Sequence, residues 1–477
     1  MEQQVISLSR LTWLVAVVLL SACSSSNAPH ADADGQAVAT NGGEIETPTD
    51  PGPGVGATPD PLAVPRLDIR ETSQLYPYRS DSPYANVLNE CAVVEDHNLA
   101  CTLNSLPFIA QATPDFTRDD ILNRLLVTHA WMGDRFAALL NDAPDIMIPL
   151  FGSVTSISIG STVRPSNYWI GTGAIQLDPE GLWLSVLEKA NVSTEEDYRS
   201  GFGDELQFWF FESMRSGRDA AVRYYSLTDR QERPYEDIKI PMYRLLYHEL
   251  AHAVDYLPSQ SVATLDPSLT PLFALLANEN LFLSPRLNND LPLYSQTLND
   301  LGQVRYRGEA ATELQKSFNP GFVGTEMVND GAARFYSYST EREDFATLFT
   351  QVMMKFSFDI DVYIAFVNKP VDEDDYVCGE LLVGWGQKNR LADSLLVPRA
   401  RWVVDTIYGS EGDFDSFFAT EIGQTASMVS GVDWCTNRDG PVIADFPGLS
   451  KTLTADTSEK KKSQMQQLFF ERRVRVH

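Results

Sequence analysis

Two histidines and a glutamate are the residues of this chain with the clearest capacity for chemistry. They lie in His248-Glu249-Leu250-Ala251-His252, which has the pattern HExxH. On a helix, residues four apart lie on one face, so both imidazoles could bind one metal ion. Glu249 would lie about 100° round the helix, where it can still reach a metal-bound water. Zinc lowers the pKa of such a water towards about 7, and Glu249 would take its proton and pass it to a leaving amine.

The residues around this motif predict a helix over 240–257. Pro241 suits a first turn, and Pro258 ends the helical pattern. Apolar residues at helical spacing supply a face for burial, namely Leu246, Leu250, Val254 and Leu257. The alternative is a helix whose two histidines merely pack or cap.

A catalytic zinc site needs a third protein ligand and one open position. The chain has 6 histidines, and the four outside the motif lie before it or at the chain's end, so a downstream carboxylate is the expected ligand. Glu343, in a helical pattern over 341–355, is the best candidate; its rivals are Glu341, Glu326 and Glu313. Asp255 lies too far along the motif's own helix, and we expect it to accept a hydrogen bond from a ligand histidine.

Two segments together resemble a known family. His248 to Asp255 (HELAHAVD), followed by Glu343-Asp344-Phe345-Ala346, is similar to zinc peptidases of the gluzincin group, in particular the anthrax lethal factor type with its HExGHAVD and E-x-F-A-E. The resemblance implies that His248, His252 and Glu343 bind Zn²⁺ and that Glu249 is the general base. It also implies that Tyr336 helps to stabilise the oxyanion, with Tyr338 as an alternative.

The chain departs from the family's pattern at three points. Ala251 replaces a glycine, and Thr347 stands where the second downstream glutamate would be. The interval between His252 and Glu343 is longer than in the lethal factor type. The resemblance is confined to the two segments around these residues.

The resemblance implies an α+β fold with a zincin-like core, in which a small twisted sheet packs on the active-site helix and a second helix carries the third ligand. Strand-like sequence precedes the motif at 146–151, 154–159 and 168–177. We expect the strand at 168–177 to be the edge strand that binds an extended peptide by strand addition, as in zincins.

The rest of the chain predicts extensions of this core. Helical patterns occur at 117–141, 201–214 and 325–336, and 258–321 reads as loop. We therefore expect a signal peptide at 1–22, a flexible tether at 23–66 and a helical N-terminal part at 67–145. A catalytic core at 146–359, a mixed C-terminal subdomain at 360–440 and a polar, basic tail at 441–477 should follow.

The N-terminal segment predicts export and lipidation. The apolar run 11–20 is about half the length of a membrane span. It ends in Leu20-Ser21-Ala22-Cys23, which resembles a bacterial lipobox whose cysteine is lipidated. A transmembrane anchor and a plain secretory signal are the alternatives. Because a serine follows Cys23, we expect a cell-envelope protein that is lipid-anchored, at the outer membrane.

Charge and cysteines limit the partners and the redox setting. A formal net charge of −28 argues against nucleic acid, and against any membrane contact beyond the lipid anchor. An even number of cysteines in the exported part predicts disulfides. Three pairings are possible, and we expect the local one, which joins Cys91 to Cys101 and Cys378 to Cys435.

The expected function is hydrolysis of peptide bonds in a peptide or protein substrate by a zinc metallopeptidase. One alternative is a zinc-site lipoprotein that binds a protein or cell-wall partner without cleaving it. Another is an amide hydrolase that acts on peptidoglycan.

Overall fold

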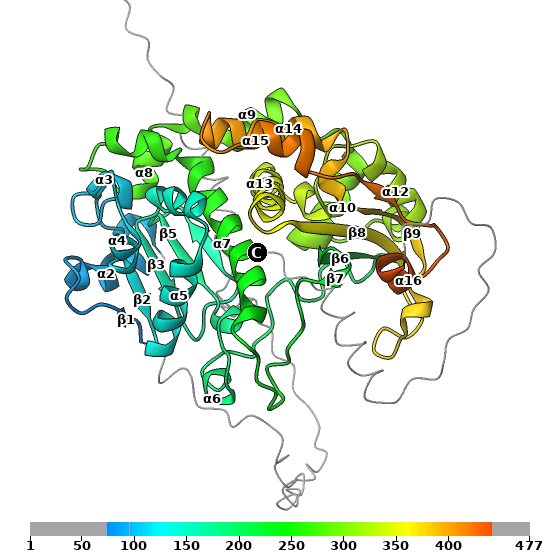
Figure 1. The fold of residues 1–477 in the computed structure, drawn as a ribbon, viewed down its shortest axis with the longest axis horizontal. Coiled ribbons are helices and arrows are strands. Elements are labelled where there is room, and N and C mark those ends of the chain that lie inside the picture. The colour runs from blue at the N-terminus through cyan, green and yellow to red at the C-terminus, as the bar shows by residue number, and fades with distance from the viewer. Residues whose placement is uncertain (1–73, 95, 441–477) are drawn as a thin grey trace, which may run out of the picture. The chain divides into compact units, whose positions relative to one another are not determined.

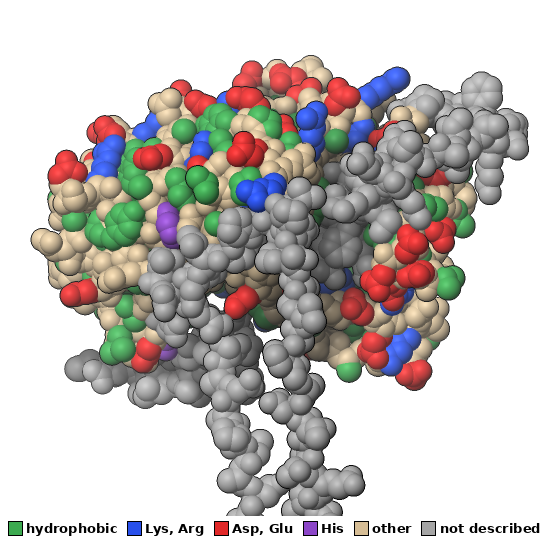
Figure 2. Space-filling view, turned by 90° about the horizontal axis from the view of Figure 1, so that it is seen from below, with side chains coloured by type: hydrophobic (Ala, Val, Ile, Leu, Met, Phe, Trp, Pro, Cys, Tyr) green, Lys and Arg blue, Asp and Glu red, His purple; other side chains and the backbone are tan. Residues whose placement is uncertain are grey.

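Helices and two small β-sheets make up an α+β fold in the computed structural model, which describes residues 74–94 and 96–440 (Figure 1). The predicted α+β class is confirmed at this level. Cys23 and the segments predicted as a signal peptide, a tether and a basic tail lie outside the described residues. Among the described helices, none is long and apolar enough to cross a membrane. Figure 2 shows acidic side chains scattered over one face, in keeping with the negative net charge.

The first sheet has the strand order β1-β2-β3-β5-β4. Its central strands β2 (Leu125–Val127), β3 (Ser156–Ile159) and β5 (Ala174–Leu177) are parallel. The outer strands β1 (Tyr76–Pro77) and β4 (Asn167–Trp169) are antiparallel to their neighbours. The edge strand β4 therefore leaves one side of its backbone available for other partners.

The second sheet is antiparallel throughout, with the order β10-β9-β8-β6-β7. Its long central strands are β6 (Phe208–Ser216) and β8 (Ile360–Asn368), flanked by β9 (Val383–Lys388), β10 (Ala426–Ser427) and β7 (Asp219–Ala220). Because β6 and β8 pair along their whole length, the predicted core and the predicted C-terminal subdomain share one sheet.

Helices α7 and α13 pack on each other between the two sheets (Figure 1). Helix α7 (Glu236–Tyr256) begins with Glu236 and Asp237, whose charges favour a helix N-terminus. It therefore starts earlier than predicted, and Pro241 lies inside it rather than in its first turn. The helix ends where Leu257 becomes extended before Pro258, as predicted.

Helix α13 (Glu341–Phe358) confirms the predicted helix at 341–355. The side chain of Thr340 caps it by accepting a hydrogen bond from the backbone N–H of Glu343 at 3.1 Å. Further along, the buried carboxylate of Asp344 binds the guanidinium of Arg399, on helix α14 (Leu396–Tyr408). The cap and this ion pair fix the first turn of α13, which carries Glu343.

Several predicted elements are wrong. The predicted helix at 117–141 is interrupted, because the apolar residues 125–127 form the buried strand β2 between α4 (Arg118–Leu122) and α5 (Ala130–Asp142). The predicted strand at 146–151 is the 3-10 helix η2 (Asp145–Ser153), which contains Pro149. Short apolar runs do not separate strand from helix by periodicity, and both segments are buried, so the sequence pattern alone could not distinguish them.

The aromatic segment predicted as a helix at 201–214 is instead turns followed by β6, with both strand faces buried. The predicted strand at 168–177 is a hairpin of β4 and β5, turned at Gly173, whose φ is 69°. The expected helix at 325–336 is also wrong. Helix α12 (Pro320–Val328) ends early, and the 3-10 helix η6 (Phe335–Tyr338) follows.

The segment 258–321 is helical rather than loop. Polar caps such as Ser295 and Thr312, which accept hydrogen bonds from backbone N–H groups, begin some of its short helices. It holds α8 (Pro271–Leu276), α9 (Leu283–Asp290), α10 (Gln296–Arg307) and α11 (Glu313–Lys316).

The structure contains the predicted disulfides. Cys91, in α2 (Ala85–Ala92), is bonded to Cys101, and Cys378 is bonded to Cys435, in α16 (Trp434–Asp439). The second bond closes the loops beside β9 in the mixed 360–440 region.

Candidate metal centre

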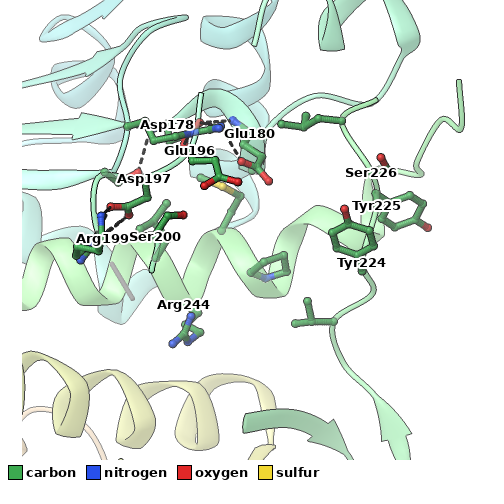
Figure 3. A pocket seen from close by; sticks show the side chains of 18 of the residues that line it. Asp178, Glu180, Glu196, Asp197, Arg199, Ser200, Tyr224, Tyr225, Ser226 and Arg244 are labelled. Carbon is green, nitrogen blue, oxygen red and sulfur yellow. Dashed lines mark hydrogen bonds and ion pairs between the residues drawn. The ribbon is translucent and has the colours of Figure 1, made fainter. Parts of the chain in front are cut away.

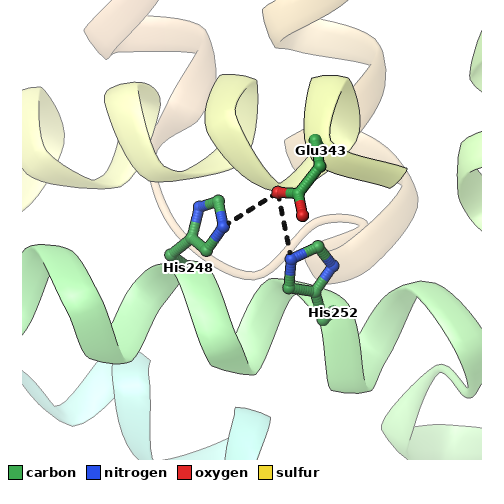
Figure 4. A group of neighbouring side chains, drawn as sticks. All are labelled: His248, His252 and Glu343. Atoms are coloured by element: carbon green, nitrogen blue, oxygen red, sulfur yellow. Dashed lines mark hydrogen bonds and ion pairs between the residues drawn. The ribbon is translucent and has the colours of Figure 1, made fainter. Parts of the chain in front are cut away.

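Helix α7 brings His248 and His252 to one face, one turn apart. Their rings are perpendicular, with centroids 4.8 Å apart. Both side chains are largely buried, with 7% and 13% of their surfaces exposed. The rings are therefore held by packing, and their Nε2 atoms point at the same place (Figure 4).

Glu343 completes the group from the first turn of α13. Its Oε2 lies 3.1 Å from Nε2 of His248 and 3.3 Å from Nε2 of His252. Ligand atoms about 2.0–2.1 Å from a tetrahedral zinc ion lie roughly 3.4 Å from one another. Two imidazole nitrogens and one carboxylate oxygen at these separations fit three ligands of a divalent cation, with one position left over.

Burial and charge set the protonation of this group. Burial lowers the pKa of His248 to about 4, so this imidazole is neutral at pH 7, as a metal ligand must be. His252 and Glu343 each stabilise the charged form of the other, and this attraction outweighs the opposite effect of burial on both pKa values. The pKa of His252 is raised and that of Glu343 lies well below its usual range. The ionised carboxylate favours a cation at the centre of the group.

Glu249 lies beside the group, next to the first sheet. It is almost fully buried, and burial raises its pKa to about 7. The backbone N–H of Tyr168, on the edge strand β4, donates to its carboxylate. Within the described part of the chain, its buried Oε1 has no hydrogen-bond partner. A buried carboxylate with a free oxygen and a pKa near neutrality is suited to take a proton.

Of the two tyrosines considered for the oxyanion role, only Tyr336 faces the group. It hydrogen-bonds Glu343, and its ring stacks beside that of His248 with centroids 6.4 Å apart. Burial and the charge of Glu343 raise its pKa well above the usual value, so the hydroxyl keeps its proton. Tyr338 donates instead to Asp330 at 3.0 Å.

The rival carboxylates are used elsewhere. Glu326 accepts a hydrogen bond from Ser295 at 2.6 Å, and Glu313 is exposed beside Lys316. Glu341 is exposed at the start of α13. Thr347 lies one turn beyond Glu343, and its buried Oγ1 has no partner among the described residues, so it does not take over the contacts of a second glutamate.

Asp255 has a different role from the predicted one. Its buried carboxylate accepts hydrogen bonds from the backbone N–H groups of Leu283 and Ser284, at 3.0 and 2.6 Å, and from Arg342 at 3.1 Å. Among the described residues, these donors do not include a histidine. Asp255 thus caps α9 and ties α7 to the residue before Glu343.

Replacing Asp255 with asparagine should lower the free energy of unfolding by about 2 kcal/mol, because it removes the charge partner of Arg342, whose side chain is only 23% exposed. Urea denaturation followed by fluorescence measures the change. The control is Asp266→Asn, which alters an exposed carboxylate that contacts only nearby Ser268. Equal midpoints for both variants would show that the Asp255 contacts are dispensable.

A cavity of about 490 Å³ opens beside His248 and extends along α7 towards Asp237. Arg199 lines it and acts electrostatically on both Glu249 and Tyr336, while Asp197 holds its guanidinium (Figure 3). Sequence reasoning did not identify Arg199, and it included Tyr168 only as part of the expected edge strand at 168–177, without its contact to Glu249. Neither belongs to a motif, and only the fold brings them to α7.

A second group of potential ligands, Cys378, Asp433 and Cys435, offers no thiolate, because both cysteines are in a disulfide.

Comparison with known proteins gives no relative. A scan against protein-family models matched none, and searches of curated proteins and of solved structures found no match. The resemblance to gluzincin peptidases therefore stays a prediction.

Proposed function

We propose that this chain is a zinc-dependent peptidase with a zincin-like core, in which His248, His252 and Glu343 hold the metal. The observation that carries the proposal is the convergence of these three side chains beside the unpartnered carboxylate oxygen of Glu249. Zinc, when bound, supplies a Lewis acid that polarises a carbonyl and lowers the pKa of water.

The chain's own residues supply the remaining chemistry. Glu249 takes a proton at its free Oε1 from the attacking water and gives it to the leaving amine. The hydroxyl of Tyr336 turns its proton from Glu343 to the negative charge that develops on the carbonyl oxygen. Both groups are buried, which strengthens these interactions by excluding solvent.

The edge strand β4 supports a peptide as the substrate. Its outer side borders the site, since the N–H of Tyr168 reaches Glu249. An extended peptide added to this edge would pass over α7, with its backbone next to the proposed base. The strand is short, so side chains in the adjoining cavity must supply much of the affinity.

The proposed setting is a lipid-anchored protein of the cell envelope, attached through Cys23 at the outer membrane. This part of the proposal rests on the sequence around Cys23 alone.

Chelation tests the proposed activity. The full chain should contain about one zinc ion and cleave an unstructured protein such as casein; 1,10-phenanthroline should abolish cleavage and added zinc should restore it. Zinc content by mass spectrometry and fragments on a gel report the two quantities. Zinc without cleavage would favour a binding lipoprotein, and release of stem peptides from peptidoglycan would favour a cell-wall amide hydrolase.

A further inference from the structure

Two arginines share a single carboxylate beside the proposed metal site. Nε of Arg334 lies 2.9 Å from Oε2 of Glu212, and Nη2 of Arg244 lies 3.4 Å from Oε1 of the same residue. Glu212 is only 3% exposed and Arg244 17%. Within residues 74–94 and 96–440, these arginines have no second carboxylate within ion-pair distance. One positive charge is therefore left unbalanced in a largely buried place.

Of the two arginines, Arg244 is the one on the helix that carries the histidines. It precedes His248 by one helical turn, so the two side chains leave α7 on the same face, about 6 Å apart along the axis. The charge of Arg244 contributes to the lowered pKa of His248. Both residues line the cavity of about 490 Å³. Figure 3 shows Arg244 extending from α7.

The groups next to Arg244 favour an anion, although the cavity lining as a whole holds more acidic than basic side chains. Burial lowers its pKa to about 10, which shows the cost of desolvating the cation, yet leaves it protonated at neutral pH. Arg305 lines the same cavity and is held by the backbone carbonyl of Phe202 at 3.0 Å. A carboxylate placed here would offset the unbalanced charge and could accept two parallel hydrogen bonds from a guanidinium.

We propose, resting on the proposed peptidase function, that Arg244 is a specificity-determining residue that binds a substrate carboxylate next to the scissile bond. The carboxylate is the side chain of an aspartate or glutamate, or the free C-terminus of the peptide. The enzyme therefore prefers substrates with such a group one residue from the bond that it cleaves.

Peptide binding to the full chain carrying Glu249→Gln tests this without cleavage. The probes are acetyl-Ala-Ala-Glu-amide, acetyl-Ala-Ala-Gln-amide and acetyl-Ala-Ala-Ala with a free carboxylate, titrated by calorimetry with and without zinc. At least one carboxylate peptide should bind about tenfold or more tightly than the glutamine amide, the fold-change that one charge-assisted hydrogen bond provides. The peptide that binds more tightly shows whether the site takes a side-chain carboxylate or a C-terminal one.

Adding Arg244→Met should remove this preference. The variant leaves Glu212 and Arg334 as a balanced pair and keeps the apolar stem, so the fold should persist. The matched control is Arg223→Met, which removes the same charge from the far end of the same cavity, where the side chain is 69% exposed. The control should keep the preference.

Two results would overturn the proposal. One is equal binding of all three peptides by the protein that retains Arg244, a comparison that needs no variant at this position. The other is a preference that survives in Arg244→Met. Failure of the peptidase function is seen separately, as absence of cleavage by the protein with Glu249 intact.

Discussion

Replacing Glu249 with glutamine should lower kcat/KM for peptide cleavage by about a thousandfold and leave the zinc content unchanged. General acid–base catalysis typically contributes about 10²–10⁴-fold, and an amide of the same shape cannot take up the proton. Because Glu249 lies beside the three potential ligands and not among them, the group that would hold the metal stays intact.

The buried position of Glu249 makes this substitution informative. Burial raises its pKa to about 7, so about half of the molecules carry a neutral carboxyl at pH 7, and a neutral amide fits the same space. The backbone N–H of Tyr168 can still donate to the carbonyl oxygen of the new amide. A loss of activity would therefore report lost chemistry and not a collapsed site.

The control is Glu236→Gln, which makes the same chemical change in the first turn of the same helix, on a side chain that is 74% exposed. It should cleave at the normal rate. Steady-state kinetics on one fluorogenic peptide and zinc analysis of both proteins give the comparison. Cleavage by Glu249→Gln within tenfold of the unaltered protein would rule out the general base, and loss of zinc would make Glu249 a ligand.

The local part of the site could be predicted from the sequence because it depends on helix periodicity alone. Once 240–257 is helical, His248 and His252 must share a face, and the structure has them so. Glu343 was harder, since its approach depends on how α13 crosses α7. The residues alone left Glu341, Glu326 and Glu313 open.

The features that were missed depend on contacts between distant segments. Glu212, Arg244 and Arg334 meet only because β6, α7 and the segment before η6 pack together. The strand β6 itself was taken for a helix, because its aromatic residues are buried on both faces and leave no alternation to read. Asp255 was expected to accept a hydrogen bond from a ligand histidine, but its donors come from α9 and α13.

Removing Glu343 gives the second large expected effect. Glu343→Ala should weaken zinc binding by more than the roughly 10–100-fold that loss of an outer contact to a ligand typically costs. The reason is geometric, since Oε2 of Glu343 lies within 3.3 Å of both Nε2 atoms. Its removal takes away the negative charge that favours a divalent cation beside the two imidazoles.

Glu341→Ala is the matched control, because Glu341 is an exposed glutamate in the same first turn of α13, two positions earlier. Zinc affinity measured by competition with a chromophoric chelator should be unchanged in this variant and greatly reduced in Glu343→Ala. The Thr340 cap uses the backbone N–H of Glu343, which alanine retains, so both variants should keep the helix start. If Glu343→Ala bound zinc at full affinity, α13 would not contribute the third ligand, and the two histidines would need another partner within reach of their Nε2 atoms.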